Sequence, residues 1–488
     1  MPMQVGQRKP TSDSWPTSSI LGPTGRRLGV ALMAIGALWL GVLWVTLTPP
    51  REARPASPPS SEVASKGQAP QPEAPARVPQ RVGLRSLVMA GEPAGPNGAF
   101  DRFGLESMTM VLAANSRGET AFHATIRRSE SEEGIFLARA DGQVARIAVA
   151  GDPVPDQTGQ LIAGFGERPA PVMNDAGTVA FTATMAGGRG AAGVFLASEG
   201  KLRTIASSGM KAPVFLGGIG VFAEFEAVSL NSRGDVAFLA WVRHGRETIE
   251  AIYVARKVGA VHQLTKIAAA GEPAPGGGFY AGFGAPVVND SGAVAFPAVV
   301  RLGPALGAIF VAPVETPAHL LLGTGDPAPT GGVFARFSER IGFDDSGRVA
   351  FGAFVNGSSG PDFGIFVADG VDRRTIAMRG QAAPGGGVYA SFGGWPAMSH
   401  TGAVAFVAAT DQGPASDGVF LMNADGKVTR LLGPGDSLMD GGKLTSLGLY
   451  PTVAAASDGS VSLLGIVERG GEETNAVLRY GLAPVSRR

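Results

Sequence analysis

The chain has 488 residues, and its 41 basic side chains are balanced by 41 acidic ones. This balance gives no electrostatic reason to expect a nucleic-acid partner, because surfaces that bind nucleic acids are rich in lysine and arginine. The sequence contains no cysteine, which excludes disulfides and thiolate metal sites.

The first 48 residues are predicted to anchor the chain in a membrane. Residues 1–27 are polar and carry Arg26 and Arg27 directly before residues 28–48, a segment with no charged side chain. That segment is long enough to cross a hydrocarbon core of about 30 Å. A cleaved signal peptide, the alternative, would have a shorter apolar region and a small-x-small cleavage site, and no such site is apparent. Because basic residues stay on the cytoplasmic side, we predict a cytoplasmic tail at 1–27 and a transmembrane signal anchor at 28–48.

Residues 49–83 are predicted to form a linker. They are dense in proline, alanine and serine and contain too few apolar residues to build a hydrophobic core. Proline-rich chain favours an extended polyproline II conformation with a rise of about 3.1 Å per residue, so the linker would hold the next domain at most roughly 100 Å from the membrane.

From residue 84 to residue 482, one sequence pattern recurs. Its most regular part is an Asn-x-x-Gly-x-x-Ala-Phe motif, as at residues 289–296, and the motif glycine returns every 55–59 residues. A fixed period of this length indicates a repeat architecture. The motif glycines are Gly118, Gly177, Gly234, Gly292, Gly347, Gly402 and Gly459.

Each repeat is predicted to contain four strands. The first begins at an aromatic-x-x-Phe step such as Phe222 and Phe225, the second is the Gly-x-Val-Ala-Phe run, and the third and fourth resemble residues 134–138 and 203–206. Asn suits the first position of a type I turn, and Gly three residues later can adopt a positive φ, so the motif predicts a hairpin between strands one and two. Along the second strand Val and Phe point to one face and Ala to the other. This pattern favours stacked sheets with both faces covered, as in a β-propeller, over a sandwich with one face in water.

The strand count predicts how the ring closes. Residues 84–90 read as a fourth strand with no repeat before it, and the last repeat lacks a fourth strand. Pairing the two ends would leave no long exposed sheet edge. We therefore predict an all-β fold, a seven-bladed β-propeller of four-stranded blades in which the N-terminal strand closes the last blade, rather than an open solenoid. Residues 483–488 are expected to be a short C-terminal tail.

On this repeat, the chain resembles the bacterial tandem-repeat proteins defined by an Asn-x-x-Gly-x-x-Ala-Phe motif, which attach their repeat domain to the cell surface by varied ("choice-of-anchor") segments. The resemblance covers residues 84–482, and six of the seven motif copies are close. It implies a surface-exposed repeat domain and no particular activity. Together with the predicted anchor, it implies a single-pass protein of the bacterial inner membrane whose propeller lies in the periplasm or outside the cell.

No pattern in the sequence indicates a metal, a cofactor or a catalytic nucleophile. Gly-x-Ser-x-Gly and P-loop motifs are absent, and the Asn-Asp-x-Gly motif lacks the further oxygen ligands of a calcium loop. The sequence therefore predicts no metal site, no cofactor and no catalytic residues. None of the five histidines has the spacing of metal ligands: His123, His244, His262, His319 and His400.

Five carboxylates occupy one place in the turns that lead from a fourth strand into the next blade. They could cap these turns by accepting backbone N–H bonds, or they could form a ring of anions around one mouth of the channel. The least repetitive segments, the connections between second and third strands, are expected on the same face, and variable loops on a uniform scaffold often carry recognition. The candidate ligand-binding residues are Glu92, Asp152, Glu272, Asp326 and Asp436, with Arg243, His244 and Arg246.

The function predicted from these features is a membrane-anchored, extracytoplasmic binding or scaffolding module with an envelope protein or glycan as ligand. The alternative is a hydrolase or lyase that acts on an envelope polysaccharide, and a purely structural surface-layer role is a third possibility. Fold alone does not decide between them. An enzyme would need non-repeated carboxylates, histidines or tyrosines that converge at one mouth of the propeller.

Overall fold

The computed structural model describes residues 80–484, apart from residues 96–97, 105–111, 130, 167–169, 188–190, 215–217, 358–359, 371, 415 and 449–450. The predicted cytoplasmic tail and transmembrane segment, and the linker up to residue 79, lie outside the described residues. All regular elements of the described part are β-strands, and it contains no helix long and apolar enough to cross a membrane.

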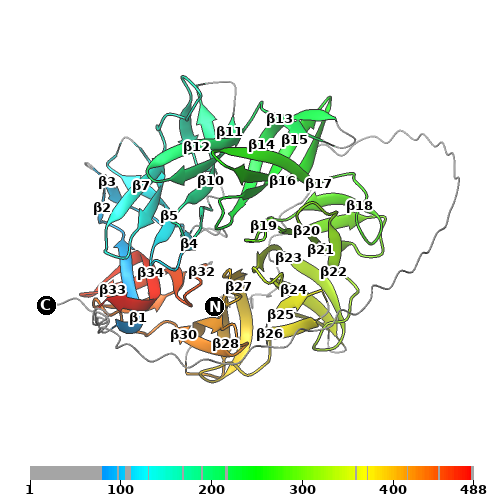
Figure 1. The fold of residues 1–488 in the computed structure, drawn as a ribbon. Helices are drawn as coiled ribbons and strands as arrows, with labels where there is room; N and C mark the ends of the chain where they lie inside the picture. Colours follow the sequence, from blue (N-terminus) through cyan, green and yellow to red (C-terminus); the bar gives the residue numbers. More distant parts are fainter. Residues whose placement is uncertain are drawn as a thin grey trace, which may run out of the picture. The chain divides into compact units, whose positions relative to one another are not determined.

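The strands form seven antiparallel sheets, which are the blades of the predicted propeller. Figure 1 shows the sheets arranged around a common centre, and in blade 5 the strands β23, β24, β25 and β26 follow one another from the centre outwards. The first strand of a blade is therefore innermost and the fourth outermost. The predicted seven-bladed, all-β fold is confirmed.

The first four blades contain these strands. Blade 1 has β2 (Pro93–Gly95), β3 (Gly98–Phe100), β4 (Leu112–Ala114), β5 (Thr120–Arg127), β6 (Glu133–Ala138) and β7 (Val144–Val149). Blade 2 has β8 (Leu161–Gly164), β9 (Val172–Met173), β10 (Val179–Ala186), β11 (Ala192–Ser198) and β12 (Lys201–Ser207). Blade 3 has β13 (Lys211–Pro213), β14 (Ile219–Leu230), β15 (Val236–His244), β16 (Glu247–Val258) and β17 (Val261–Ala269). Blade 4 has β18 (Phe279–Phe283), β19 (Val287–Val288), β20 (Val294–Arg301), β21 (Gly307–Ala312) and β22 (His319–Gly323).

The remaining three blades complete the ring. Blade 5 has β23 (Val333–Phe343), β24 (Val349–Gly357), β25 (Gly360–Asp369) and β26 (Asp372–Met378). Blade 6 has β27 (Val388–Met398), β28 (Val404–Asp411), β29 (Asp417–Met422) and β30 (Val428–Leu432). Blade 7 has β31 (Lys443–Ser446), β32 (Val453–Ala455), β33 (Val461–Arg469), β34 (Glu472–Pro484) and, from the other end of the chain, β1 (Gln80–Met89).

Hydrophobic side chains fill the spaces between blades. Between blades 3 and 4, Tyr280, Phe296 and Phe310 of blade 4 pack against smaller side chains of blade 3, including Ala237 and Ile252. The rings of Phe296 and Phe310 stack with their centroids 5.6 Å apart, and Tyr280 meets Phe310 edge-on at 5.1 Å. The large residues of one blade thus face the small residues of the preceding blade, as the alternation along the second strand predicts.

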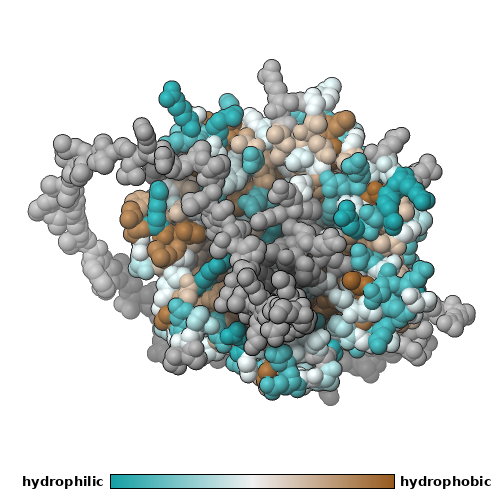
Figure 2. All heavy atoms as spheres, turned by 180° about the vertical axis from the view of Figure 1, so that it is seen from behind, coloured by the Kyte–Doolittle hydropathy of each residue, from teal (hydrophilic) through white to brown (hydrophobic). Residues whose placement is uncertain are grey.

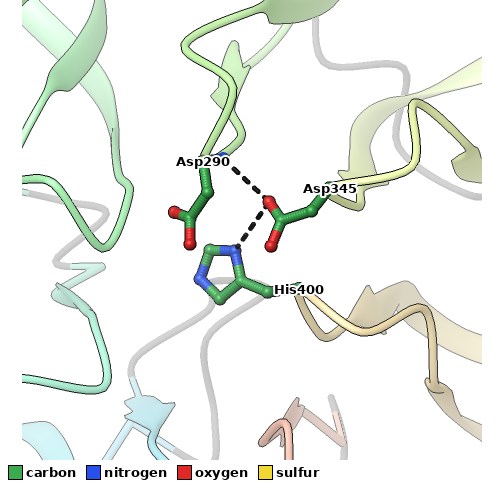
Figure 3. Close-up of side chains that lie close together, drawn as sticks. All are labelled: Asp290, Asp345 and His400. Atoms are coloured by element: carbon green, nitrogen blue, oxygen red, sulfur yellow. Dashed lines mark hydrogen bonds and ion pairs between the residues drawn. The ribbon is translucent and has the colours of Figure 1, made fainter. Parts of the chain in front are cut away.

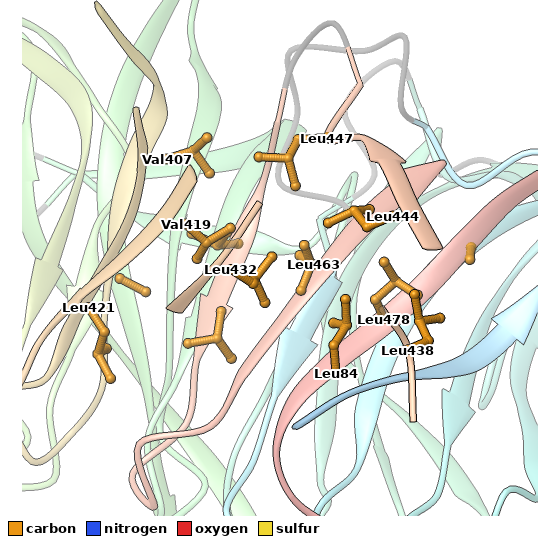
Figure 4. Packing of buried hydrophobic residues seen from close by; sticks show 14 of the residues in the cluster. Leu84, Val407, Val419, Leu421, Leu432, Leu438, Leu444, Leu447, Leu463 and Leu478 are labelled. Carbon is orange, nitrogen blue, oxygen red and sulfur yellow. The ribbon is translucent and has the colours of Figure 1, made fainter. Parts of the chain in front are cut away.

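The N-terminal strand closes the ring as predicted. β1 pairs with β34 from Gln80 to Met89, so the strand begins at Gln80 rather than at residue 84. Leu84 packs with Leu463 in the cluster between blades 6 and 7 (Figure 4), and Val88 packs with Phe122 in the cluster between blades 7 and 1. β1 therefore contributes side chains to both faces of the closing blade.

The motif hairpins have the predicted turn chemistry. In blade 3 the side-chain oxygen of Asn231 accepts the backbone N–H of Asp235 at 2.9 Å, and the N–H of Gly234 donates to the carbonyl of Asn231 at 3.1 Å. Gly234 has a φ of 89°, a conformation in which other residues are strained. The Asn and Gly of the motif therefore both stabilise the turn in this blade.

The motif asparagines also join neighbouring blades, which the turn chemistry did not predict. Each side-chain amide donates to the backbone carbonyl of the first motif residue in the next blade. Because these asparagines are buried, each bond satisfies a donor and an acceptor that water cannot reach. The bonds run from Asn115 to Asn174 at 3.4 Å, from Asn174 to Asn231 at 3.0 Å, from Asn231 to Asn289 at 2.9 Å and from Asn289 to Asp344 at 3.0 Å.

Other groups make the connection where the motif residue lacks an amide. The backbone N–H of Asp345 donates to the carbonyl of His400 at 3.1 Å, and the hydroxyl of Thr401 donates to the carbonyl of Ser457 at 3.3 Å. Between blades 7 and 1 the buried guanidinium of Arg479 donates to the carbonyl of Asn115 at 2.9 Å. The hairpins of all seven blades are thus connected in a closed series of hydrogen bonds, which we call the hairpin ring.

Deleting residues 84–90 is expected to destabilise the propeller strongly, because it removes the buried side chains of Leu84, Leu87, Val88 and Met89. Burial of one such side chain contributes about 1.5–3 kcal/mol, so the loss is on the order of 6 kcal/mol or more. A deletion of similar length in the linker, residues 55–62, is the control. We expect a clearly lower melting temperature for the first variant only. Equal melting temperatures would show that β1 is not needed to close the ring.

Candidate functional site

The predicted carboxylates lie beside the fourth strands, in the turns that lead into the next blade. In blade 1 a carboxylate oxygen of Asp152 accepts the backbone N–H of Val149 at 2.9 Å, and the other oxygen pairs with Arg146. The backbone of this turn also bonds to the next blade, since the N–H of Ile162 donates to the carbonyl of Asp152 at 2.8 Å. Asp152 therefore both caps its turn and lies at a junction between blades.

Three of the other carboxylates repeat this arrangement. Each accepts the N–H of the residue three positions before it, and each has a basic side chain nearby. Burial lowers the pKa of Lys266, the partner of Glu272. The cap distances are 2.9 Å for Glu272, 3.1 Å for Asp326 and 2.8 Å for Asp436, and the bases beside Asp326 and Asp436 are Arg373 at 3.0 Å and Arg430 at 3.8 Å.

These contacts support the turn-cap interpretation of four of the five carboxylates. Glu92 differs: it is exposed, and its carboxylate accepts no hydrogen bond from another described residue. A carboxylate that caps a turn and pairs with a base has less charge to offer a ligand than a free one. Ligand binding by the five carboxylates stays a prediction.

The predicted residues Arg243, His244 and Arg246 lie on the hairpin that joins β15 and β16. All three are exposed, and His244 pairs with Glu247 across a two-residue turn that includes Arg246. This hairpin has nine residue pairs, whereas the equivalent hairpin of blade 4 has six. It therefore extends further along the strand direction and displays its charged side chains on the face where the second and third strands are joined.

A different group of polar side chains meets on the opposite face, where the motif hairpins lie. Asp290, Asp345 and His400 follow the first motif residue in blades 4, 5 and 6, at positions 55 residues apart. One ligand atom from each residue lies within 4.8 Å of the other two. Figure 3 shows the three side chains pointing toward one another from three separate hairpins.

Hydrogen bonds of the hairpins position this group. The N–H of Asp290 donates to one carboxylate oxygen of Asp345 at 2.8 Å, and the N–H of Ser232 in blade 3 donates in the same way to Asp290 at 2.7 Å. One oxygen of each carboxylate is therefore used between blades. Among the described residues, none donates to the second oxygen of either carboxylate, and no lysine or arginine pairs with Asp290 or Asp345.

His400 is the third member of the group, and its Nδ1 atom makes no hydrogen bond within the described part of the chain. Nδ1 lies 3.8 Å from a carboxylate oxygen of Asp345, which is too long for a hydrogen bond. This atom is buried and has no hydrogen-bond partner within the described part of the chain. The site thus combines an unpaired ring nitrogen with two carboxylate oxygens.

Histidine spacings within one segment of the sequence do not reveal this group. The ligands come instead from one position in three consecutive repeats. Aligning the repeats shows the signal: that position holds Asp, Asp and His in succession in blades 4 to 6. Elsewhere it is Ser116, Asp175, Ser232 and Ser457.

Comparison with known proteins places the chain in a family. The model of DUF7453, a family of unknown function, matches residues 62–266 and again residues 259–463, which together cover most of the chain. The chain belongs to this family. The first DUF7453 match ends within β17 and the second within β33, so the family model describes successive groups of blades.

No curated protein matches this DUF7453 chain. Similar solved structures include the polysaccharide lyase Uly1, with a TM-score of 0.41 and 10% identity over 81% of this chain and 97% of that one. The Dos1 propeller has a TM-score of 0.37 and 10% identity over 82% and 95% of the two chains. The GH93 α-L-arabinofuranosidase of Fusarium graminearum, in complex with arabinobiose, has a TM-score of 0.34 and 11% identity over 70% and 97%. At these identities the likeness concerns the fold alone.

In this DUF7453 propeller, Asp152→Ala is expected to lower stability, because it leaves the N–H of Val149 without its acceptor and removes the partner of Arg146. Loss of such a bond costs about 1 kcal/mol. Glu92→Ala is the matched control, since its carboxylate caps no turn, and its melting temperature should equal that of the unmodified chain. If both variants melt alike, the capping bond does not contribute to stability.

Proposed function

We propose that the protein is a membrane-anchored, extracytoplasmic β-propeller that acts as a binding or scaffolding module at the bacterial cell envelope. The apolar segment 28–48 and the linker that follows it support the anchoring. The resemblance to tandem-repeat proteins with varied surface anchors supports the placement of the propeller outside the cytoplasm.

The binding function is inferred from a contrast between two parts of the propeller: its turns repeat from blade to blade, whereas the connections between second and third strands vary. The recurring asparagines and turn carboxylates are used in hydrogen bonds within the propeller. The connections between second and third strands differ in chemistry from blade to blade. Blade 3 displays Arg243 and Arg246, whereas blade 4 exposes Leu302 and Leu306, which are 86% and 71% accessible. Such variation on a fixed frame is typical of a recognition surface.

The chemistry of the surface supports a polar ligand with some apolar contacts. Seen from behind the view of Figure 1, the described surface mixes hydrophilic residues with separate hydrophobic patches (Figure 2). Glycans combine hydroxyl groups with apolar ring faces, and envelope proteins have mixed surfaces, so both ligand classes fit.

The test is binding of the full-length chain, in lipid nanodiscs, to purified envelope polysaccharides, peptidoglycan fragments and envelope proteins. Arg243→Ala combined with Arg246→Ala should weaken binding by about tenfold or more, since charged hydrogen bonds contribute roughly 1.5–3 kcal/mol each. The melting temperature should not change, because both side chains are exposed.

Arg301→Ala is the matched control, because Arg301 occupies in blade 4 the strand position that Arg243 occupies in blade 3. Binding that survives the double variant would place recognition elsewhere. An equal loss in the Arg301 variant would indicate a general charge effect rather than a site on the blade 3 hairpin.

The second candidate function, a hydrolase or lyase acting on an envelope polysaccharide, is favoured by one observation. Asp290, Asp345 and His400 are titratable side chains from three blades that converge on one face, as the side chains of an enzyme's active site do. Incubating the full-length chain with the same polysaccharides would detect new reducing ends or unsaturated products. Activity that is lost in Asp345→Asn but kept in the blade 3 variant would support this candidate over the binding module.

A further inference from the structure

We infer that Asp290, Asp345 and His400 form a site for a divalent transition-metal ion. The site lies on the face of the motif hairpins, at the opposite end of the strands from the proposed recognition loops. The inference therefore goes beyond the proposed binding function and does not depend on it.

The donor set determines the class of ion. Two carboxylate oxygens and one imidazole nitrogen suit Zn²⁺, Mn²⁺ or Fe²⁺. Ca²⁺ takes six to eight oxygen ligands and no imidazole, so this set does not suit it. Because the residues come from three consecutive blades, the ion would also connect blades 4, 5 and 6.

The geometry requires only small movements. The ligand atoms lie within 4.8 Å of one another, whereas bonds of about 2.1 Å hold neighbouring ligand atoms about 3 Å apart. Asp345 is exposed and Asp290 and His400 are half-buried, so rotation of the side chains can close this difference. The backbone stays in place, because the hairpin ring fixes all three hairpins.

The unused ligand atoms give a physical reason for an ion at this place. Nδ1 of His400 is buried without a hydrogen-bond partner among the described residues, and an unsatisfied buried polar atom is unfavourable. Asp290 and Asp345 bring two negative charges together without a lysine or arginine partner in the described part of the chain. A divalent cation would satisfy the nitrogen and neutralise both carboxylates.

Contrast with the other blades shows that this arrangement is local. Asp175 of blade 2 also accepts a bond from the preceding hairpin, the N–H of Ser116 at 2.8 Å. The next blade has Ser232 at the same position, so Asp175 has no carboxylate neighbour there. The carboxylates therefore share one structural role, whereas within the described residues the ligand cluster occurs only where Asp, Asp and His are consecutive.

Three protein ligands leave coordination positions open. Structural zinc sites are closed by four protein ligands, while sites with three keep a position for water or another small ligand. The inferred ion would therefore have an exchangeable position, which an anionic or hydroxyl group of a larger ligand could occupy.

The experiment is metal binding by the full-length chain after removal of metal with a chelator. Isothermal titration with Zn²⁺ and with Mn²⁺ should show one site per chain, and the bound ion should raise the melting temperature, because it binds the folded state. Asp345→Asn and His400→Gln should each weaken binding by about 100-fold. Asp345→Asn keeps an oxygen that can accept the N–H of Asp290, so its metal-free melting temperature should stay close to that of the unmodified chain.

Asp175→Asn is the matched control, because it changes the equivalent hairpin residue outside the cluster. It should bind the ion as the unmodified chain does, and so should the variant with Arg243 and Arg246 replaced. Absence of saturable binding by the unmodified chain would overturn the inference. So would equal affinities of the Asp345, His400 and Asp175 variants, since the ion would then bind elsewhere.

Discussion

Hydrogen bonds from each motif hairpin to the next fix the places of the blades around the ring. Four of these bonds come from asparagine side chains that are almost fully buried, such as Asn231. The same side chain caps its own turn through its oxygen, so one residue fixes both the hairpin and its neighbour. Removing it would leave the N–H of Asp235 without its acceptor and would take one of two hydrogen bonds from the carbonyl of Asn289, which is costly at a buried position.

The hairpin ring explains why the two faces of the propeller differ. On the motif face the hairpins are held at fixed positions, so residues that follow the motif Asn, such as Asp290 and Asp345, are placed near one another with little freedom. On the other face, no comparable series of hydrogen bonds joins the described residues of the connections between second and third strands, and the lengths and side chains of these connections vary. Side chains held at fixed positions suit a metal site, and varied loops suit recognition of a larger ligand.

Much of this architecture could be predicted from local patterns and from counting. The Asn231–Gly234 turn follows from turn chemistry, and closure by β1 follows from one unmatched strand at each end. The inter-blade donation by Asn231 could not be found this way, because it depends on a neighbour 58 residues away. Arg479 replaces the missing amide from a different strand, so no alignment of motifs reveals it. The cluster with His400 was missed for a related reason, since its ligands are adjacent only across blades.

The most direct test of this account is the stability of Asn231→Ala, measured by thermal and urea unfolding of the full-length chain. Ser232→Ala, a neighbouring exposed change that keeps every backbone bond, is the control. We expect a loss of roughly 2–4 kcal/mol for Asn231→Ala, because the N–H of Asp235 and the carbonyl of Asn289 both lose a partner, and almost no loss for Ser232→Ala. Equal stabilities of the two variants would contradict it, because the blades would then be held together by hydrophobic packing alone.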